Sequence, residues 1–196
     1  TAGVTGSIPV APTIPQHPAS GPHAVGACAP ATGKAAPMPE PDSAALSRVA
    51  ELLNAAERPL LLLGGGTSSP QAAAAVLEFI EQQHIPVVMS LQGLGVVPHG
   101  HEMAVGMLGM HGARASNMLV EECDVLVVVG ARLGDRATGR LDSFCPKSGL
   151  IHIDIDASEV GKLRMPQVGL TADATQALRL LMPLLQPRRR DSWLDR

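Results

Sequence analysis

Apolar residues from residue 43 onward fall into two patterns, continuous runs and helical spacing. Residues 60–63 are all leucine, and residues 125–129 contain only valine and leucine. Uninterrupted runs of this length are typical of strands buried on both faces of a parallel sheet. We expect five such strands, at 60–63, 85–90, 125–129, 150–156 and, more briefly, 168–170.

Between these runs, apolar residues recur every three or four positions, which predicts helices. Asp42 and Ser69 are N-cap residues, and Pro70 suits a first helical turn. We expect helices over about 43–56, 70–83, 113–122 and 158–163, and a last one capped by Asp173. Strands that alternate with helices predict an α/β fold, a parallel β-sheet with helices on both faces.

The two ends of the chain differ in composition from this central part. Residues 1–42 hold nine of the 17 prolines and only three charged residues. A segment so poor in large apolar side chains cannot offset its ordering entropy, so we interpret it as a Pro/Gly-rich linker or disordered segment. The arginines of 188–190 predict a solvated basic tail over 188–196. The folded domain is therefore expected to span 43–187.

Composition narrows the class of protein. A net charge of -3 gives no reason to expect nucleic acid as a partner, and no apolar run approaches the length of a membrane span. Cys28, Cys123 and Cys145 show neither a disulfide framework nor a zinc pattern. These features favour a cytoplasmic protein with buried or inert thiols.

Unusual residues stand at the predicted strand ends, where parallel sheets bind ligands. The first strand ends in Gly64-Gly65-Gly66, the second in Ser90, the third in Gly130-Ala131-Arg132 and the fourth in Asp154 and Asp156. Each has a plainer interpretation: a tight turn, an Arg–Asp surface network, or an Asp156 that caps the next helix. Taken together they favour a nucleotide-type cofactor site, with glycine and arginine for phosphate and aspartate for ribose.

Three glycines recur at every third position of Gly106–Gly112. Neither a helix nor a strand favours that spacing. We expect a loop that brings bare backbone close to a ligand, although a glycine-rich surface turn is the alternative. Neither a dinucleotide fingerprint nor a catalytic constellation occurs, and His99-Gly100-His101-Glu102 is interpreted as a polar turn rather than a metal site.

Several motifs together resemble one enzyme family. They are Gly106–Gly112, Ala115-Ser116-Asn117, Cys123-Asp124, Val129–Arg132, Asp135-Arg136, Thr138-Gly139 and 152–156. From Ala45 onward the chain resembles the middle domain of the acetolactate (acetohydroxyacid) synthase large subunit, a thiamine-diphosphate enzyme. The resemblance implies a Rossmann-like central domain, with Trp193 at the start of the link to a C-terminal domain.

The resemblance also implies an activity and a cofactor. The parent enzyme would condense two 2-oxo acids with loss of carbon dioxide, in branched-chain amino-acid biosynthesis. Its thiamine diphosphate and Mg²⁺ would lie between two other domains, and FAD in the middle domain would undergo no net redox change. Met107 and Met110 would line the flavin ring, and His111 would be a polar contact. Met110, Asp135 and Arg136 would also lie near the substrate channel. The residues implied to bind FAD are Gly64, Gly65, Ser90, Leu91, Leu108, Gly109, Met110, His111, Gly130, Ala131, Arg132, Arg136, Asp154, Ile155 and Asp173.

The chain also departs from the family. Gly134 stands where the family usually has an aspartate, and the thiamine-binding motifs and catalytic glutamate are absent. We therefore expect this chain to be a piece of a longer protein and to be inactive without the missing domains. The full-length protein is expected to be a homo-oligomer and to bind a small regulatory subunit. The alternatives are a ligand-free structural or assembly module, and the central domain of a sibling enzyme such as glyoxylate carboligase or pyruvate oxidase.

Overall fold

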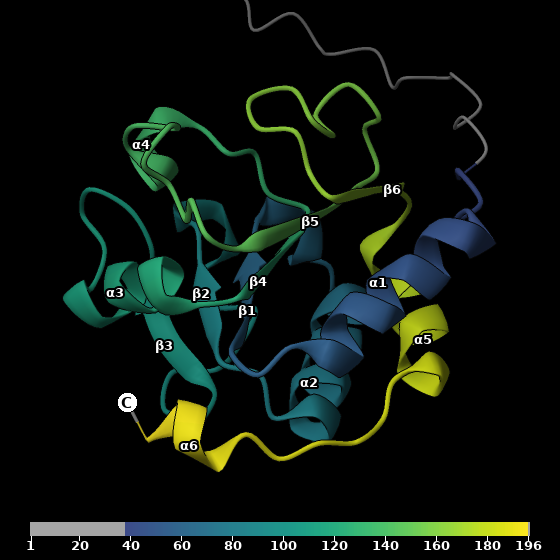
Figure 1. The fold of residues 1–196 in the computed structure, drawn as a ribbon, viewed down its shortest axis with the longest axis horizontal. Coiled ribbons are helices and arrows are strands. Elements are labelled where there is room, and N and C mark those ends of the chain that lie inside the picture. Colours follow the sequence, from purple (N-terminus) through teal and green to yellow (C-terminus); the bar gives the residue numbers. More distant parts are fainter. Residues whose placement is uncertain (1–37, 196) are drawn as a thin grey trace, which may run out of the picture. The chain divides into compact units, whose positions relative to one another are not determined.

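The structure is a computed structural model that describes residues 38–195. The linker expected over 1–42 therefore lies almost wholly outside the described residues. Within them, six parallel strands form one sheet in the order β3-β2-β1-β4-β5-β6, so the expected α/β class is confirmed (Figure 1). The strands are β1 (Pro59–Leu63), β2 (Val87–Met89), β3 (Ala104–Met107), β4 (Val125–Val129), β5 (Gly149–Asp154) and β6 (Val168–Thr171).

The helices begin where the sequence places caps. The Asp42 carboxylate accepts from the amides of Ala44 and Ala45, and the Ser69 hydroxyl accepts from the Ala72 amide. The α-helices are α1 (Ser43–Ala55), α2 (Pro70–Gln83), α3 (Arg114–Glu122), α4 (Asp135–Thr138), α5 (Ala174–Leu181) and α6 (Asp191–Leu194). Short 3-10 turns are η1 (Gly65–Thr67), η2 (Leu91–Gly93) and η3 (Met182–Leu184).

The strand order reverses at the centre of the sheet. β1 pairs with β2 on one side and with β4 on the other, so Leu61 lies opposite both Val87 and Val127. The chain therefore leaves β1 in one direction and later returns to its other side. This is the order of doubly wound dinucleotide-binding sheets, in which ligands bind outside the carboxyl ends at the reversal.

Alternate residues of the strands supply two cores. Leu61 and Leu63 face α1, α2 and α5, which lie together on one side of the sheet (Figure 1). Leu60 and Leu62 face the other way, toward Val120 of α3 and Trp193 of α6. Both cores are apolar, which explains the uninterrupted leucine run of β1.

Two sequence expectations about element boundaries are wrong. Gly106 and Met107 lie in strand β3 and not in a loop. The pairing of β3 with β2 shifts register between Val87 and Val88, and glycine accommodates the resulting irregularity. The helix expected at 158–163 is a series of turns. Gly161, with φ of +78°, interrupts it.

The tail is also not solvated as expected. Arg190 is 4% exposed and Trp193 is 2% exposed. The Arg190 guanidinium donates to the carbonyls of Leu53 and Gln83 at 3.1 and 2.7 Å. The Trp193 indole N–H donates to the Pro59 carbonyl at 2.8 Å. Residues 188–194 are thus part of the folded domain.

Candidate functional site

The carboxyl ends of β1 and β4 meet through bare backbone. The Gly64 amide donates to the Val129 carbonyl and the Gly66 amide to the Gly130 carbonyl, both at 3.0 Å. A Cβ on Gly64 would lie 2.1 Å from the Gly130 oxygen. The glycine run therefore first serves close packing of two strand ends, and two of its three amides are engaged in that packing.

The loop after β2 packs on the loop after β1. The Ser90 amide donates to the Leu63 carbonyl at 2.9 Å, and a Cβ on Gly93 would lie 2.4 Å from the same oxygen. Gly65 is exposed and faces Gln92, whose Cβ would lie 3.2 Å from a Cβ at Gly65. The structure thus brings Gly64, Gly65 and Ser90 together at one edge, as the sequence predicts.

A small cavity of about 70 Å³ lies at the ends of β4, β5 and β6. Its lining includes four residues of the predicted site: Gly130, Asp154, Ile155 and Asp173. Oδ1 of Asp154 accepts from the Asp156 amide at 3.0 Å, and Oδ1 of Asp173 accepts from the Gln176 amide at 3.1 Å. Within residues 38–195 no hydrogen bond uses the Oδ2 atom of Asp154 or Asp173, so each carboxylate can accept from a ligand hydroxyl.

The two predicted arginines are exposed beside this edge. Neither the Arg132 nor the Arg136 guanidinium takes part in a salt bridge among the described residues. Asp156 accepts from the Ser158 amide and hydroxyl, and these bonds, with weaker contributions from Lys162 and Arg132, lower the pKa of its carboxyl. Asp156 thus closes a turn and does not cap a helix. Arg132 and Arg136 are available to an anionic ligand.

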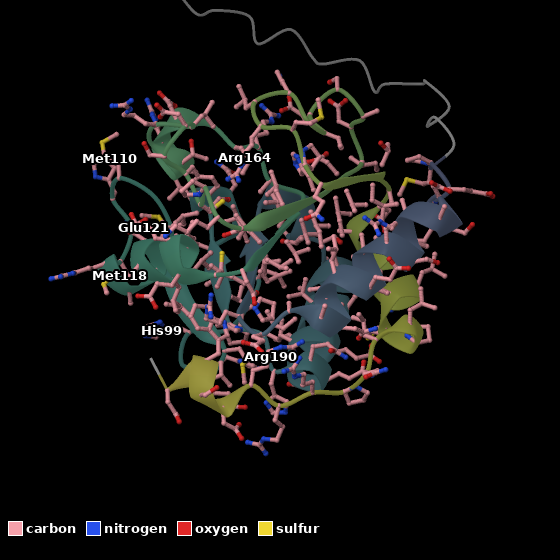
Figure 2. All side chains as sticks on the ribbon, viewed as in Figure 1. His99, Met110, Met118, Glu121, Arg164 and Arg190 are labelled. Atoms are coloured by element: carbon pink, nitrogen blue, oxygen red, sulfur yellow. The ribbon has the colours of Figure 1, made fainter. Side chains whose placement is uncertain are left out.

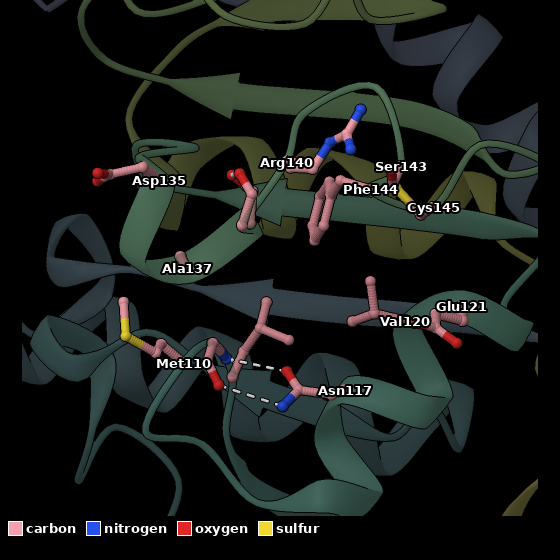
Figure 3. Close-up of a pocket in the computed structure, with 14 residues that line it drawn as sticks. Met110, Asn117, Val120, Glu121, Asp135, Ala137, Arg140, Ser143, Phe144 and Cys145 are labelled. Atoms are coloured by element: carbon pink, nitrogen blue, oxygen red, sulfur yellow. Dashed lines mark hydrogen bonds between the residues drawn. The ribbon is translucent and has the colours of Figure 1, made fainter.

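A larger cavity, about 390 Å³, lies between the segment after β3 and the segment after β4 (Figure 3). Three predicted residues line it: Leu108, Gly109 and Met110. Asp135, which the resemblance implies to lie near the substrate channel, also lines it. The other lining residues were given no role from the sequence. They are Asn117, Val120, Glu121, Ala137, Thr138, Gly139, Arg140, Ser143, Phe144 and Cys145.

Backbone contacts fix the shape of the larger cavity. The Asn117 side chain donates to the Gly109 carbonyl and accepts from the Gly109 amide, at 3.1 and 3.0 Å (Figure 3). The Met110 amide donates to the Arg136 carbonyl at 3.0 Å. A Cβ on Gly109 would lie 2.3 Å from that carbonyl oxygen, so only glycine fits there. Asn117 belongs to one of the family motifs, but the sequence did not reveal that its side chain holds Gly109 at the cavity.

Several predicted residues at this edge are strongly exposed, including Met110 and Ile155, which border the two cavities. Leu91 and Met110 are 69% and 72% exposed, Ile155 is 50% exposed, and His111 is also exposed. Ala131, in contrast, is buried, and its carbonyl lies 3.1 Å from Nε2 of His152. The predicted set therefore borders two cavities along one edge of the sheet and does not line a single closed pocket.

Three buried titratable groups lie in the interior of the domain. Burial lowers the pKa of His152, which favours a neutral imidazole that donates from Nε2 to Ala131. Burial raises the pKa of Cys123 to about 12 and also raises the pKa of Cys145. Cys123 and Cys145 are free thiols, as expected, whereas Cys28 lies outside the described residues. His152 is a packing histidine that sequence reasoning did not single out.

Residues 38–195 contain neither a metal-binding cluster nor a membrane-spanning helix. No group of three or more His, Cys, Asp or Glu side chains in this range could hold a metal ion. No helix of the same range is long and apolar enough to cross a bilayer.

Comparison with known proteins gives consistent matches. Residues 46–181 match the family model for the thiamine pyrophosphate enzyme, central domain. The chain is 42% identical over 164 residues to the acetolactate synthase isozyme 1 large subunit of Escherichia coli, which covers 84% of this chain and 29% of that protein. It is 43% identical over 143 residues to the isozyme 2 large subunit, covering 73% of this chain and 25% of that protein. A probable acetolactate synthase large subunit of Methanocaldococcus jannaschii is 40% identical over 154 residues, covering 77% and 26%. The chain thus spans less than a third of the length of these relatives.

Proposed function

Because this chain belongs to the thiamine pyrophosphate enzyme central-domain family, we propose that it is the FAD-binding central domain of an acetolactate synthase. One observation carries the cofactor assignment. Residues from six separate segments converge on the carboxyl edge of a sheet whose order reverses between β1 and β4. That edge offers glycine backbone and two arginines as donors and two carboxylates as acceptors, which suit the phosphates and the sugar hydroxyls of a dinucleotide.

The carboxylates, the arginines and the apolar side chains of this edge would each bind a different portion of FAD. The Oδ2 atoms of Asp154 and Asp173 would accept hydrogen bonds from sugar hydroxyls. Arg132 and Arg136 would bind the diphosphate, since guanidinium groups form paired bonds to phosphate oxygens. Leu108 and Met110 would contact the apolar isoalloxazine ring. Bound FAD would supply this ring and its diphosphate, without net redox change in the main reaction.

The rest of the function would lie outside this chain. Condensation of 2-oxo acids with loss of carbon dioxide would take place on thiamine diphosphate and Mg²⁺, held by domains that the relatives' additional length can accommodate. A homo-oligomer, a small regulatory subunit and a cytoplasmic location complete the proposal. In this assignment no residue of the chain is catalytic, and its contribution is to bind and orient the flavin.

Titration of the purified chain with FAD, followed by flavin fluorescence and by calorimetry, tests the assignment. We expect saturable binding of one FAD, and about a tenfold weaker affinity for Arg132→Gln because one charged contact to phosphate is lost. Arg48→Gln is the matched control, since Arg48 is exposed on α1 and, among residues 38–195, pairs only with Glu51. Absence of saturation at about 100 µM, on the order of 5 kcal/mol of binding free energy or less, would contradict a preformed site.

A ligand-free assembly module is the second candidate. The exposure of Leu91, Met110 and Ile155 favours it, because apolar groups gathered at one edge are typical of a docking surface. The sibling enzymes remain a further alternative, and they would share the flavin site. Light scattering discriminates: concentration-dependent association without FAD binding supports the module, and a monomer that binds FAD rejects it.

A further inference from the structure

Arg164 links the segment between β5 and β6 to the segment before β5 by hydrogen bonds. It lies in the segment between β5 and β6, and its half-buried guanidinium points toward the segment before β5 (Figure 2). One terminal nitrogen donates to the Phe144 carbonyl and to Sγ of Cys145, the latter at 2.7 Å. The other donates to the Cys145 carbonyl at 2.9 Å. One guanidinium group thus donates hydrogen bonds to the carbonyls of two consecutive residues.

The residues that Arg164 holds form one wall of the larger cavity. Phe144 and Cys145 both line it and are 6% and 1% exposed. Cys145 has φ of +37°, a left-handed conformation that is unfavourable for any residue with a Cβ. Such a conformation persists only where the surroundings hold it, and here the guanidinium holds it by donating to both carbonyls. The wall therefore depends on a residue that does not itself line the cavity.

The segment that carries Arg164 begins at the other cavity. It follows Asp154 and Ile155, which line the small cavity, and it is closed by the Asp156–Ser158 turn and a Lys162–Glu159 ion pair of 2.8 Å. One compact segment thus borders the small cavity at its start and holds the wall of the larger cavity through Arg164.

We propose that Arg164 is a positioning residue for the isoalloxazine portion of the ligand site. The inference rests on the proposed function, because it takes FAD as the ligand that reaches both cavities. Arg164 holds Phe144 and Cys145 where they form the wall, and it leaves the sugar and phosphate contacts to other residues. Loss of Arg164 therefore weakens the contacts to the isoalloxazine ring and spares the contacts to the sugar and phosphates.

The test compares FAD with ADP, which shares the adenosine and phosphates but lacks the isoalloxazine ring. For Arg164→Gln and Arg164→Lys we expect a Kd for FAD about tenfold higher and a Kd for ADP within about twofold. The lysine variant keeps the charge but cannot fork between two carbonyls. Arg48→Gln again serves as control and should change neither Kd. Equal weakening of FAD and ADP, or no change in either, overturns the proposal.

A readout without ligand separates this inference from the proposed function. Alkylation of Cys145 by iodoacetamide, measured by mass spectrometry with buried Cys123 as internal reference, should become several-fold faster in Arg164→Gln. Arg164 lowers the pKa of this thiol, so its removal alone would slow alkylation, and a faster reaction reports that the wall has opened. If the parent chain binds no FAD but Cys145 becomes reactive, the function fails and the positioning of the wall stands. Unchanged Cys145 reactivity in both folded variants, judged by circular dichroism, overturns the positioning role.

Discussion

At Gly64 the backbone of the β1 end lies so close to the β4 end that no side chain fits between them. A Cβ at this position would lie 2.1 Å from the Gly130 oxygen and 2.4 Å from the Ala131 Cα. Gly134 is the contrasting case, since no atom of residues 38–195 beyond its chain neighbours lies within 4 Å of a Cβ there. The two glycines look alike in sequence, and only the proximity of another strand end distinguishes them.

A pair of alanine substitutions tests this difference. Gly64→Ala should lower the free energy of unfolding by about 2 kcal/mol or more, because both neighbours are backbone and cannot move aside independently. Gly134→Ala should change it by less than about 1 kcal/mol, because Ala reduces the entropy of the unfolded chain but is a poorer N-cap for α4 than glycine. Urea unfolding followed by circular dichroism measures both. Equal stability of the two variants would contradict the close approach at Gly64.

At the scale of elements, the segment after α5 closes the amino-terminal edge of the sheet. It passes from α5 to α6 beside the start of β1, where Trp193 donates to the Pro59 carbonyl (Figure 1). Arg190 donates to the last carbonyls of α1 and α2, where the helix dipoles favour a positive charge. Trp193 then packs in the second core, beside the strands. The segment therefore links the helices of one face to the core of the other.

The neighbouring arginines provide a matched test of this link. Arg190→Met should lower the free energy of unfolding by about 2–4 kcal/mol, because buried carbonyls of Leu53 and Gln83 lose a charged donor. Arg189→Met should change it by less than about 0.5 kcal/mol, since Arg189 is exposed and, within the part of the chain that the structure describes, pairs only with Asp191. Urea midpoints of the two variants are the measurement. Similar midpoints would mean that the tail is not part of the stable domain.

At the scale of the whole molecule, buried thiols make folding stability depend on alkaline pH. Burial raises the pKa of Cys123 from 9.0 to about 12. Between these two values the folded chain keeps a proton that the unfolded chain has lost. The stability that this proton contributes is therefore complete below pH 9 and disappears as the pH rises toward 12.

Unfolding measured from pH 8 upward should show this loss. The stability of the parent should fall by up to about 1.4 kcal/mol per pH unit from this thiol above its unfolded pKa. Cys123→Ala should flatten the slope, although it removes buried volume. Val120→Ala, which removes volume from the same core without a titrating group, should keep the slope of the parent. A parent and a Cys123→Ala variant with parallel pH profiles would refute the assignment.

Much of this architecture could be predicted from local signals. The caps at Asp42, Ser69 and Asp173 and the apolar runs of β1 and β4 gave the correct elements, because capping and strand burial depend on neighbours along the chain. The same reasoning failed at Gly106 and at 158–163, where a bulge beside β2 and a left-handed Gly161 decided the outcome. The bulge depends on pairing with β2, a partner that the local pattern around Gly106 does not reveal.

The candidate site was likewise predictable from the sequence only in part. The order of strands and loops along the chain was sufficient to assign Gly64, Arg132 and Asp154 to one edge, because the carboxyl ends of parallel strands must lie together. Three features needed the folded chain: the use of two Gly64–Gly66 amides in packing, the division of the edge into two cavities, and the hold of Arg164 on Cys145. Each arises from contacts between segments whose separation and orientation no local pattern encodes. Residue types and their periodicity therefore determine which edge carries the site, and three-dimensional packing determines its shape.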